Sequence, residues 1–313
     1  MDHIIVALRA VTPSFLVILS GAFARTRRWV GEEDVAHFNK VCFSLFLPCM
    51  FFHSLYRCDL TTDYDPGMML FCVAGVAVSW VVSIAVALVL PEKDQGRRGI
   101  LVTAFYLSNS MLLALPIVQS IYGEAYLSKT SIIVGIAVPI NNLLGVVSVA
   151  MFRGGKVKLG QALWRILTNP LIVGCLAGLG LNLIHFPLPS VIDTAANTLG
   201  SAAPPLMMFL VGCYYQPNLM GAQKRNVAAT IVMRLAVIPA LAVLAAVALG
   251  YRGPDLLMIL INFGAPVGVL VFGLASQMES DVRLSCTLIV TSTAVSCLTM
   301  SAWLVLLMNL GLL

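Results

Sequence analysis

Two hydrophobic stretches of the sequence contain polar residues and a proline where an ordinary helix would contain neither. These residues are Ser108, Asn109, Ser110 and Pro116 in SNSMLLALP, and Asn262 and Pro266 in INFGAPVGVLVFG. Proline removes one backbone donor and crowds the preceding turn, which leaves carbonyl and amide groups without helical partners. With the Asn and Ser side chains, these groups could bind a polar or charged small molecule. The alternative is a simple proline kink whose Asn and Ser side chains bond to a neighbouring helix.

Three further residues have the chemistry to join such a site. Asn141 and Asn142 follow Pro139 in the middle of another hydrophobic stretch, and an unpaired amide in lipid is costly. We expect both amides to face the protein interior, where they either line a cavity or bond to another helix. Arg234 is the one charge deep inside a hydrophobic stretch, which makes it a functional candidate. It is expected to bind or attract an anion, to be a fixed strut capped by carbonyls, or to extend towards the cytoplasmic face.

The sequence lacks the motifs of the common catalytic and metal centres. It contains no HExxH, no GxSxG and no pair of carboxylates within a hydrophobic stretch. The eight cysteines are scattered without a CxxC pair, which is typical of small apolar filling residues. We therefore expect no enzyme, no catalytic residue, no metal site and no cofactor. The connections are also too short for a nucleic-acid-binding module, although the net charge is +5.

Composition places these residues in a membrane protein. Of the 313 residues, 59% are hydrophobic and 11% are charged, whereas soluble domains carry about 25% charged residues. A spanning helix needs about 20 apolar residues, and ten stretches meet this requirement. They are 4–24, 36–57, 66–90, 99–121, 129–152, 162–184, 189–214, 226–250, 254–277 and 284–312. The predicted fold class is an all-α integral membrane protein with ten transmembrane helices.

Lysine and arginine are concentrated in alternate connections between these stretches. The first, third, fifth, seventh and ninth connections hold fourteen of the 19. The opposite face holds Arg9, Arg57, Lys129 and Arg252. By the positive-inside rule the odd-numbered connections are cytoplasmic, so both termini are predicted to lie outside the cell membrane.

The two halves of the sequence place proline and glycine alike. Residues 157 apart match three times, as Pro13 and Pro170, Gly21 and Gly178, and Pro48 and Pro205. Pro116 matches Pro266 at an offset of 150. A five-helix repeat begins its second copy on the opposite side of the membrane, so we predict an inverted repeat, with residues 1–152 as the first copy, 153–161 as a short cytoplasmic linker and 162–313 as the second copy. Interrupted helices at matching places in such repeats indicate a substrate site near the membrane midplane.

Four segments carry a family resemblance. They are TPSFLVILSGAFARTRRWV, FNKVCFSLFLPCMFF, SNSMLLALP and NPLIVGCLAGLGLNL. These segments resemble the auxin efflux carrier family, and the resemblance runs over nearly the whole chain. That family includes plant auxin exporters and bacterial permeases linked to malonate and other organic acids, and it is related in fold to bile-acid/sodium symporters. The short linker 153–161 stands where plant exporters have a long loop, which favours a bacterial-type member in an inner membrane.

The resemblance implies how the helices divide. Helices one, two, six and seven would form a scaffold, often the dimer interface, and helices three to five and eight to ten would form a moving transport domain. Helices four and nine would cross at their prolines, here Pro116 and Pro266. A substrate carboxylate would be held near this crossing by helix dipoles, Asn109 and Asn262. Family members usually have glycines within the helix-four motif, where this chain has Met111 and Ala114.

The expected function is that of a secondary transporter that moves small organic anions by alternating access. No carboxylate sits clearly at mid-membrane, although such a residue is common in cation-driven carriers. Cation coupling is therefore not required by the sequence. A sodium- or proton-coupled symporter of the bile-acid type and a non-transporting membrane receptor remain the alternatives. The expected partners are a small carboxylate, membrane lipid and a second copy of the chain through the scaffold helices, without nucleic acid.

Overall fold

The computed structural model describes residues 2–57, 65–123, 126–152, 168–215 and 223–313. All regular elements in these ranges are helices, which confirms the all-α prediction for them. Among the described residues, four helical stretches are long and apolar enough to cross a membrane: Glu33–Tyr56, Pro66–Val89, Lys224–Ala248 and Val282–Asn309. Shorter apolar helices accompany them. The chain is thus built as a multi-pass membrane protein.

Helices overlap every one of the predicted hydrophobic stretches. In the first half they are α1 (Asp2–Thr26), α2 (Glu32–Val41), η1 (Cys42–Phe46), α3 (Leu47–Tyr56), α4 (Pro66–Val89), α5 (Gln95–Tyr106), α6 (Ser110–Tyr122) and α7 (Leu127–Phe152). In the second half they are α9 (Pro170–Leu183), α10 (Ser190–Tyr214), α12 (Lys224–Val232), η3 (Met233–Val237), α13 (Ile238–Ala248), α14 (Gly253–Gly264), α15 (Leu270–Gln277) and α16 (Val282–Asn309). The predicted linker 153–161 lies outside the described residues, as does the start of the stretch 162–184.

The helix starts follow from local chemistry. The Asp65 carboxylate accepts the Met68 backbone N–H at 3.0 Å at the start of α4, and Asn169 caps α9 in the same way. Such side chains satisfy donors that the first turn of a helix leaves unpaired. The Met68 N–H lowers the pKa of the Asp65 carboxyl below its usual value; partial burial opposes this shift and nearby Lys129 adds to it.

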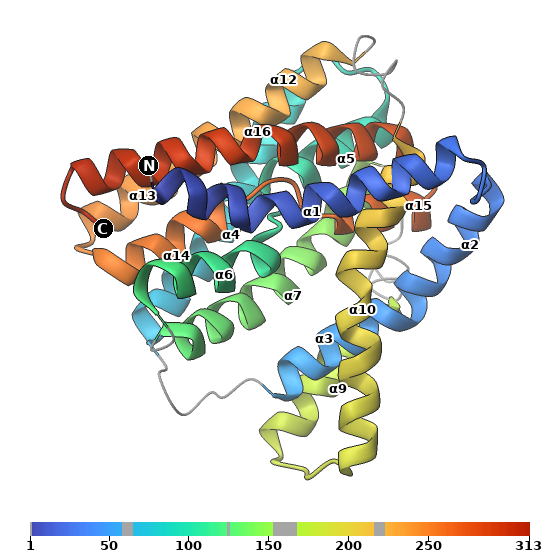
Figure 1. Ribbon diagram of the computed structural model, residues 1–313, viewed down its shortest axis with the longest axis horizontal. Helices are drawn as coiled ribbons and strands as arrows, with labels where there is room; N and C mark the ends of the chain where they lie inside the picture. Colours follow the sequence, from blue (N-terminus) through green and yellow to red (C-terminus); the bar gives the residue numbers. More distant parts are fainter. Residues whose placement is uncertain (1, 58–64, 124–125, 153–167, 216–222) are drawn as a thin grey trace.

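Four helices form a close-packed layer that we call the glycine layer: α1, α3, α9 and α10. Figure 1 shows α3, α9 and α10 together at the lower right, with α1 crossing α10. A Cβ atom on Gly212 of α10 would overlap the Ile18 carbonyl of α1, and one on Gly21 would overlap the Phe209 carbonyl. Only glycine lets two backbones come this close.

Two glycines spaced four apart, Gly174 and Gly178, lie on α9, and such a spacing permits close helix packing. A Cβ on Gly174 would lie 2.5 Å from the Pro48 carbonyl oxygen, and one on Gly178 would overlap the Phe52 carbonyl. Both glycines therefore let α9 pack directly against the backbone of α3.

Candidate functional site

The predicted stretches 99–121 and 254–277 are each two helices separated by extended chain, and the two interruptions meet. The Asn109 N–H donates to the Pro266 carbonyl at 2.9 Å, and the Gly268 N–H donates to the Leu107 carbonyl at 3.0 Å. Ser108 and Val267 form an antiparallel bridge between these bonds. We call residues 107–109 and 265–269 the crossing. It brings both interrupted stretches to one point in the protein interior.

Glycine is needed at the crossing itself. A Cβ on Gly268 would overlap the Leu107 side chain and would lie 3.2 Å from the Ser108 carbonyl oxygen. Gly264, by contrast, would place a Cβ 3.4 Å from its nearest neighbour, the Cβ of Pro239. Gly264 and Gly268 are spaced four apart but do not form a helix-packing pair, because α14 ends at Gly264 and the chain leaves the helix between them.

The prediction that the helices cross at Pro116 is wrong for the first half. Pro116 lies inside α6, and the break lies at Leu107–Asn109. Ser and Asn compete with helical hydrogen bonds and favour helix starts, so the polar triplet ends one helix and begins the next. Val267 follows Ser108 by 159 residues, which is closer to the offset of 157 than to the offset of 150 that the two prolines suggested.

Polar atoms without a hydrogen-bond partner gather at the crossing. Within the described residues, the Ser108 and Ser110 hydroxyls and both polar atoms of the Asn262 side chain are buried and unpartnered. The side chain of Asn109 is also buried, with an exposed fraction of 8%. Buried polar groups of native proteins are normally paired. These groups therefore hold hydrogen-bonding capacity for a ligand.

The helices that begin at the crossing present their N-terminal ends to it. Asn109 precedes α6 and Val269 precedes α15, and neither side chain caps the helix it precedes. Each N-terminus carries roughly half a positive charge. In the first turn of α15 the Val271 and Phe272 N–H groups donate to the Gly268 and Val269 carbonyls, so the dipole and the nearby side chains provide most of the attraction for an anion. Two such ends beside unpartnered hydroxyl and amide groups make a setting that suits a carboxylate.

Two neighbouring helices connect to the crossing through hydrogen bonds. The Tyr106 hydroxyl donates to the Asn141 carbonyl of α7 at 3.0 Å. The Ser292 hydroxyl of α16 accepts the Val267 N–H at 3.1 Å, a bond that the sequence did not predict. The Asn141 Oδ1 and Asn142 Nδ2 atoms are buried and unpartnered among the described residues. Both predicted amides of α7 thus face the interior.

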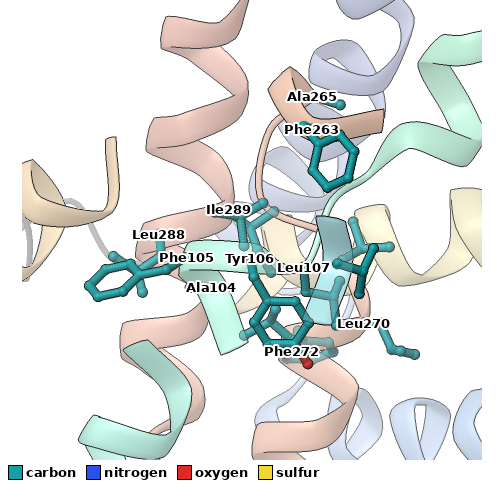
Figure 2. Packing of buried hydrophobic residues seen from close by; sticks show 14 of the residues in the cluster. Ala104, Phe105, Tyr106, Leu107, Phe263, Ala265, Leu270, Phe272, Leu288 and Ile289 are labelled. Atoms are coloured by element: carbon teal, nitrogen blue, oxygen red, sulfur yellow. The ribbon is translucent and has the colours of Figure 1, made fainter. Parts of the chain in front are cut away.

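Hydrophobic side chains surround this polar centre. Figure 2 shows them: Ala104, Phe105, Tyr106, Leu107, Phe263, Ala265, Leu270, Phe272, Leu288 and Ile289. All are buried, with exposed fractions of 6% or less. Electrostatic interactions are stronger in such a weakly polar setting than in water.

Arg234 lies in η3, the π-helical turn between α12 and α13, and is completely buried. Its three guanidinium nitrogens donate to backbone carbonyls of Tyr106, Asn262 and Ala265. Of the three interpretations open from the sequence, this geometry favours the strut capped by carbonyls.

A cluster of titratable side chains, Asp193, Arg57 and His53, lies away from the crossing. Asp193 at the start of α10 pairs with Arg57, and its Oδ1 atom lies 3.4 Å from the Nε2 atom of His53. No group of three or more His, Cys, Asp or Glu side chains that could hold a metal ion occurs among the described residues.

Comparison with known proteins gives this geometry a context. A family model described as membrane transport protein matches residues 6–158 and 155–304. An uncharacterized transporter of Methanothermobacter thermautotrophicus is 24% identical over 296 residues, which are 93% of this chain and 95% of that protein. A probable auxin efflux carrier component 3b of Oryza sativa is 27% identical over 132 residues, which are 40% of this chain and 22% of the plant protein. An uncharacterized transporter of Methanocaldococcus jannaschii is 23% identical over 99% of both chains.

Proposed function

Because the chain belongs to the membrane transport protein family, that of the auxin efflux carriers, we propose that it is a secondary transporter of small organic anions and that the crossing holds the substrate carboxylate. Family membership supports a role as a transporter, and the proposal includes no catalytic activity. The proposed substrates are carboxylates, either malonate-like or auxin-like acids.

One observation carries the carboxylate assignment. The N-termini of α6 and α15 lie at the crossing without side-chain caps, next to the unpartnered groups of Ser108, Ser110 and Asn262. The half-helix N-termini of carriers with discontinuous helices point at anionic substrate groups. A carboxylate can accept hydrogen bonds from the hydroxyl and amide donors together, whereas a cation would be repelled by both helix ends.

We infer that this site works by alternating access and that the chain is built from two inverted five-helix repeats. Two ion pairs support the symmetry. Lys129 of α7 lies 2.7 Å from Asp255 of α14, and Arg97 of α5 lies 2.7 Å from Asp281, which precedes α16. In an inverted repeat α5 corresponds to α14 and α7 to α16, so the two pairs occupy matching places with their charges exchanged.

The glycine layer suits the role of scaffold, since its backbones are in direct contact and leave little freedom for sliding. α2 and η1 continue into α3 and would belong to the same scaffold. The helices α4–α7 and α12–α16, including both halves of the crossing, would then form the moving domain. A homodimer through the glycine layer, a bacterial-type cell membrane location and termini on the outer side complete the proposal.

Export of an anion needs no coupled ion. One negative charge that moves outward gains about 2.3 kcal/mol per 100 mV of inside-negative potential. That free energy corresponds to a roughly fifty-fold concentration bias, because about 1.4 kcal/mol is a factor of ten.

Counterflow in proteoliposomes tests the proposal. Vesicles are loaded with mono- and dicarboxylates or indole-3-acetate, with and without sodium or proton gradients, and uptake of the radiolabelled acid is measured for wild type and Asn109→Ala. We expect counterflow that persists without gradients and falls at least about tenfold in the variant. Uptake that requires a cation gradient would instead support the symporter of the bile-acid type. Absence of counterflow for the whole panel, from folded protein, would contradict a carboxylate carrier and favour a receptor.

A further inference from the structure

Arg234 holds together the two helices that end at the crossing. Its Nε atom donates to the Ala265 carbonyl at 2.7 Å, Nη1 to the Tyr106 carbonyl at 2.7 Å, and Nη2 to the Asn262 carbonyl at 3.3 Å. The side chain is completely buried. One guanidinium group from η3 therefore bonds to the ends of both α5 and α14.

Each of these carbonyls has lost its helical partner because of the interruption. The Asn262 carbonyl would accept the N–H of residue 266 in a continuous helix, but Pro266 has no N–H. Tyr106 is the last residue of α5 and Ala265 follows the end of α14, so the chain beyond each is extended. The three oxygens thus form a cluster of free acceptors, which we call the carbonyl cage.

The charge of Arg234 is balanced by these helix ends. Each helix C-terminus carries roughly half a negative charge, so α5 and α14 together supply about one unit opposite the guanidinium. None of the ion pairs between described residues includes Arg234. The pairing is therefore between a side-chain cation and two backbone dipoles.

Carbonyl oxygens at interrupted helices and half-helix C-termini are the groups that bind coupling cations in transporters with discontinuous helices. Oxygen clusters of this kind suit hard cations. We propose that Arg234 is a built-in cation that occupies the carbonyl cage in place of a coupling ion, so that the crossing binds no sodium. This inference rests on the proposed carrier function. It explains why movement of the anion would not be coupled to sodium: the protein itself supplies the positive charge at the crossing.

Arg234 is in this account a positioning residue, and it has a signature that a merely structural role would not produce. A strut that only fills space would, when shortened, lower stability equally in all salts. A built-in cation, when removed, leaves an electronegative cage that a free cation can enter. The response to sodium therefore separates the two roles.

The test is thermal unfolding of the purified full-length chain in detergent. Sodium chloride is titrated against N-methylglucamine chloride at constant ionic strength, with wild type, Arg234→Met and Arg234→Lys. We expect no saturable sodium response in wild type or in Arg234→Lys, which keeps the charge. In Arg234→Met we expect a lower Tm and a saturable rise of about 5 °C at sodium concentrations about 100-fold above the Kd.

Arg97→Met is the matched control, because Arg97 is an arginine at the other end of α5 that pairs with the Asp281 side chain and not with the carbonyl cage; it should show no sodium response. A saturable response in wild type overturns the proposal, and so does a folded Arg234→Met that ignores sodium. If Arg234→Met does not fold, Arg234→Gln is judged by the same two outcomes. This unfolding experiment contains no carboxylate substrate. A result against the sodium proposal therefore does not bear on the proposed carrier function, which the counterflow experiment tests separately.

Discussion

The glycine layer and the crossing are both places where backbones meet deep in the protein, and they meet in opposite ways. In the layer, Gly174, Gly178 and Gly212 bring helices into direct contact. At the crossing, extended chains pair through backbone hydrogen bonds, and polar atoms remain unpartnered around them. Eight described residues hold buried unpartnered side-chain atoms. Five of them lie at the crossing, on the adjoining turns of α6 and α14, or on α7, and none lies on α1, α3, α9 or α10. The contrast indicates that one region sets geometry and the other keeps bonding capacity for a ligand.

The largest expected effect concerns the glycine layer. Gly178→Leu should destabilise the protein by more than about 3 kcal/mol, because overpacking alone costs about 1–3 kcal/mol and here the obstacle is the Phe52 backbone. Gly180→Leu on the same helix should change Tm little, since a Cβ there meets nothing within 4 Å. Thermal unfolding in detergent measures both. Equal losses in the two variants would show that the close contact does not hold the layer together.

The second prediction sharpens the functional side of the comparison. Asn262→Leu should lower counterflow at least about tenfold while Tm stays unchanged or rises, because the amide makes no hydrogen bond in the described structure and burial of an unpaired amide is costly. Asn169→Leu is the matched control; it removes the cap of α9 and should cost about 1 kcal/mol. A comparable loss of stability in Asn262→Leu would mean that this amide is structural.

The third prediction tests how α16 supports the crossing. Ser292→Ala leaves the buried Val267 N–H without its acceptor and should cost about 1–3 kcal/mol. The hydroxyl of Ser296 bonds to the Thr293 carbonyl within α16, so Ser296→Ala should cost less. Denaturation midpoints compare the two variants. A larger loss for Ser296→Ala would contradict the role given to Ser292.

The smallest expected effect lies outside both regions. The folded protein lowers the pKa of Asp65, mainly through the Met68 N–H, so this group adds stability that is present above its unfolded pKa of about 3.9 and is lost as pH falls through the lower folded value. The side chain is 38% exposed, so screening limits the contribution to at most about 1 kcal/mol. Unfolding from pH 7 down to pH 3 should be less pH-dependent in Asp65→Asn. An unchanged pH dependence of unfolding in Asp65→Asn would show that the Asp65 carboxylate does not contribute to stability.

Much of this arrangement could be predicted from composition and from the placement of breaking residues. The helical stretches, the break near Pro266 and the contact made by Gly174 and Gly178 all follow from local chemistry. The position of the first break could not be predicted in this way. Proline is tolerated inside α6, whereas Ser108 and Asn109 pair with Val267 and Pro266 of the second interrupted segment. Whether the proline or the polar triplet ends the helix depends on pairing with Val267, which is distant in the sequence.

The role of Arg234 was also open for a physical reason. A buried charge requires a partner, and a sequence reveals only those partners that are charged or polar side chains. Here the partners are three backbone carbonyls, which every residue possesses. One local signal existed, since the proline four residues after Asn262 left its carbonyl free.

The central claim, that the crossing binds a carboxylate, is tested most directly by comparing each acid with its neutral amide. Saturable Tm shifts are measured for malonate against malonamide and for indole-3-acetate against indole-3-acetamide, in wild type and Asn109→Ala. We expect a shift for at least one acid, none for its amide, and at least about tenfold weaker binding in the variant. Equal shifts by acid and amide, or an unchanged Kd in Asn109→Ala, would contradict it.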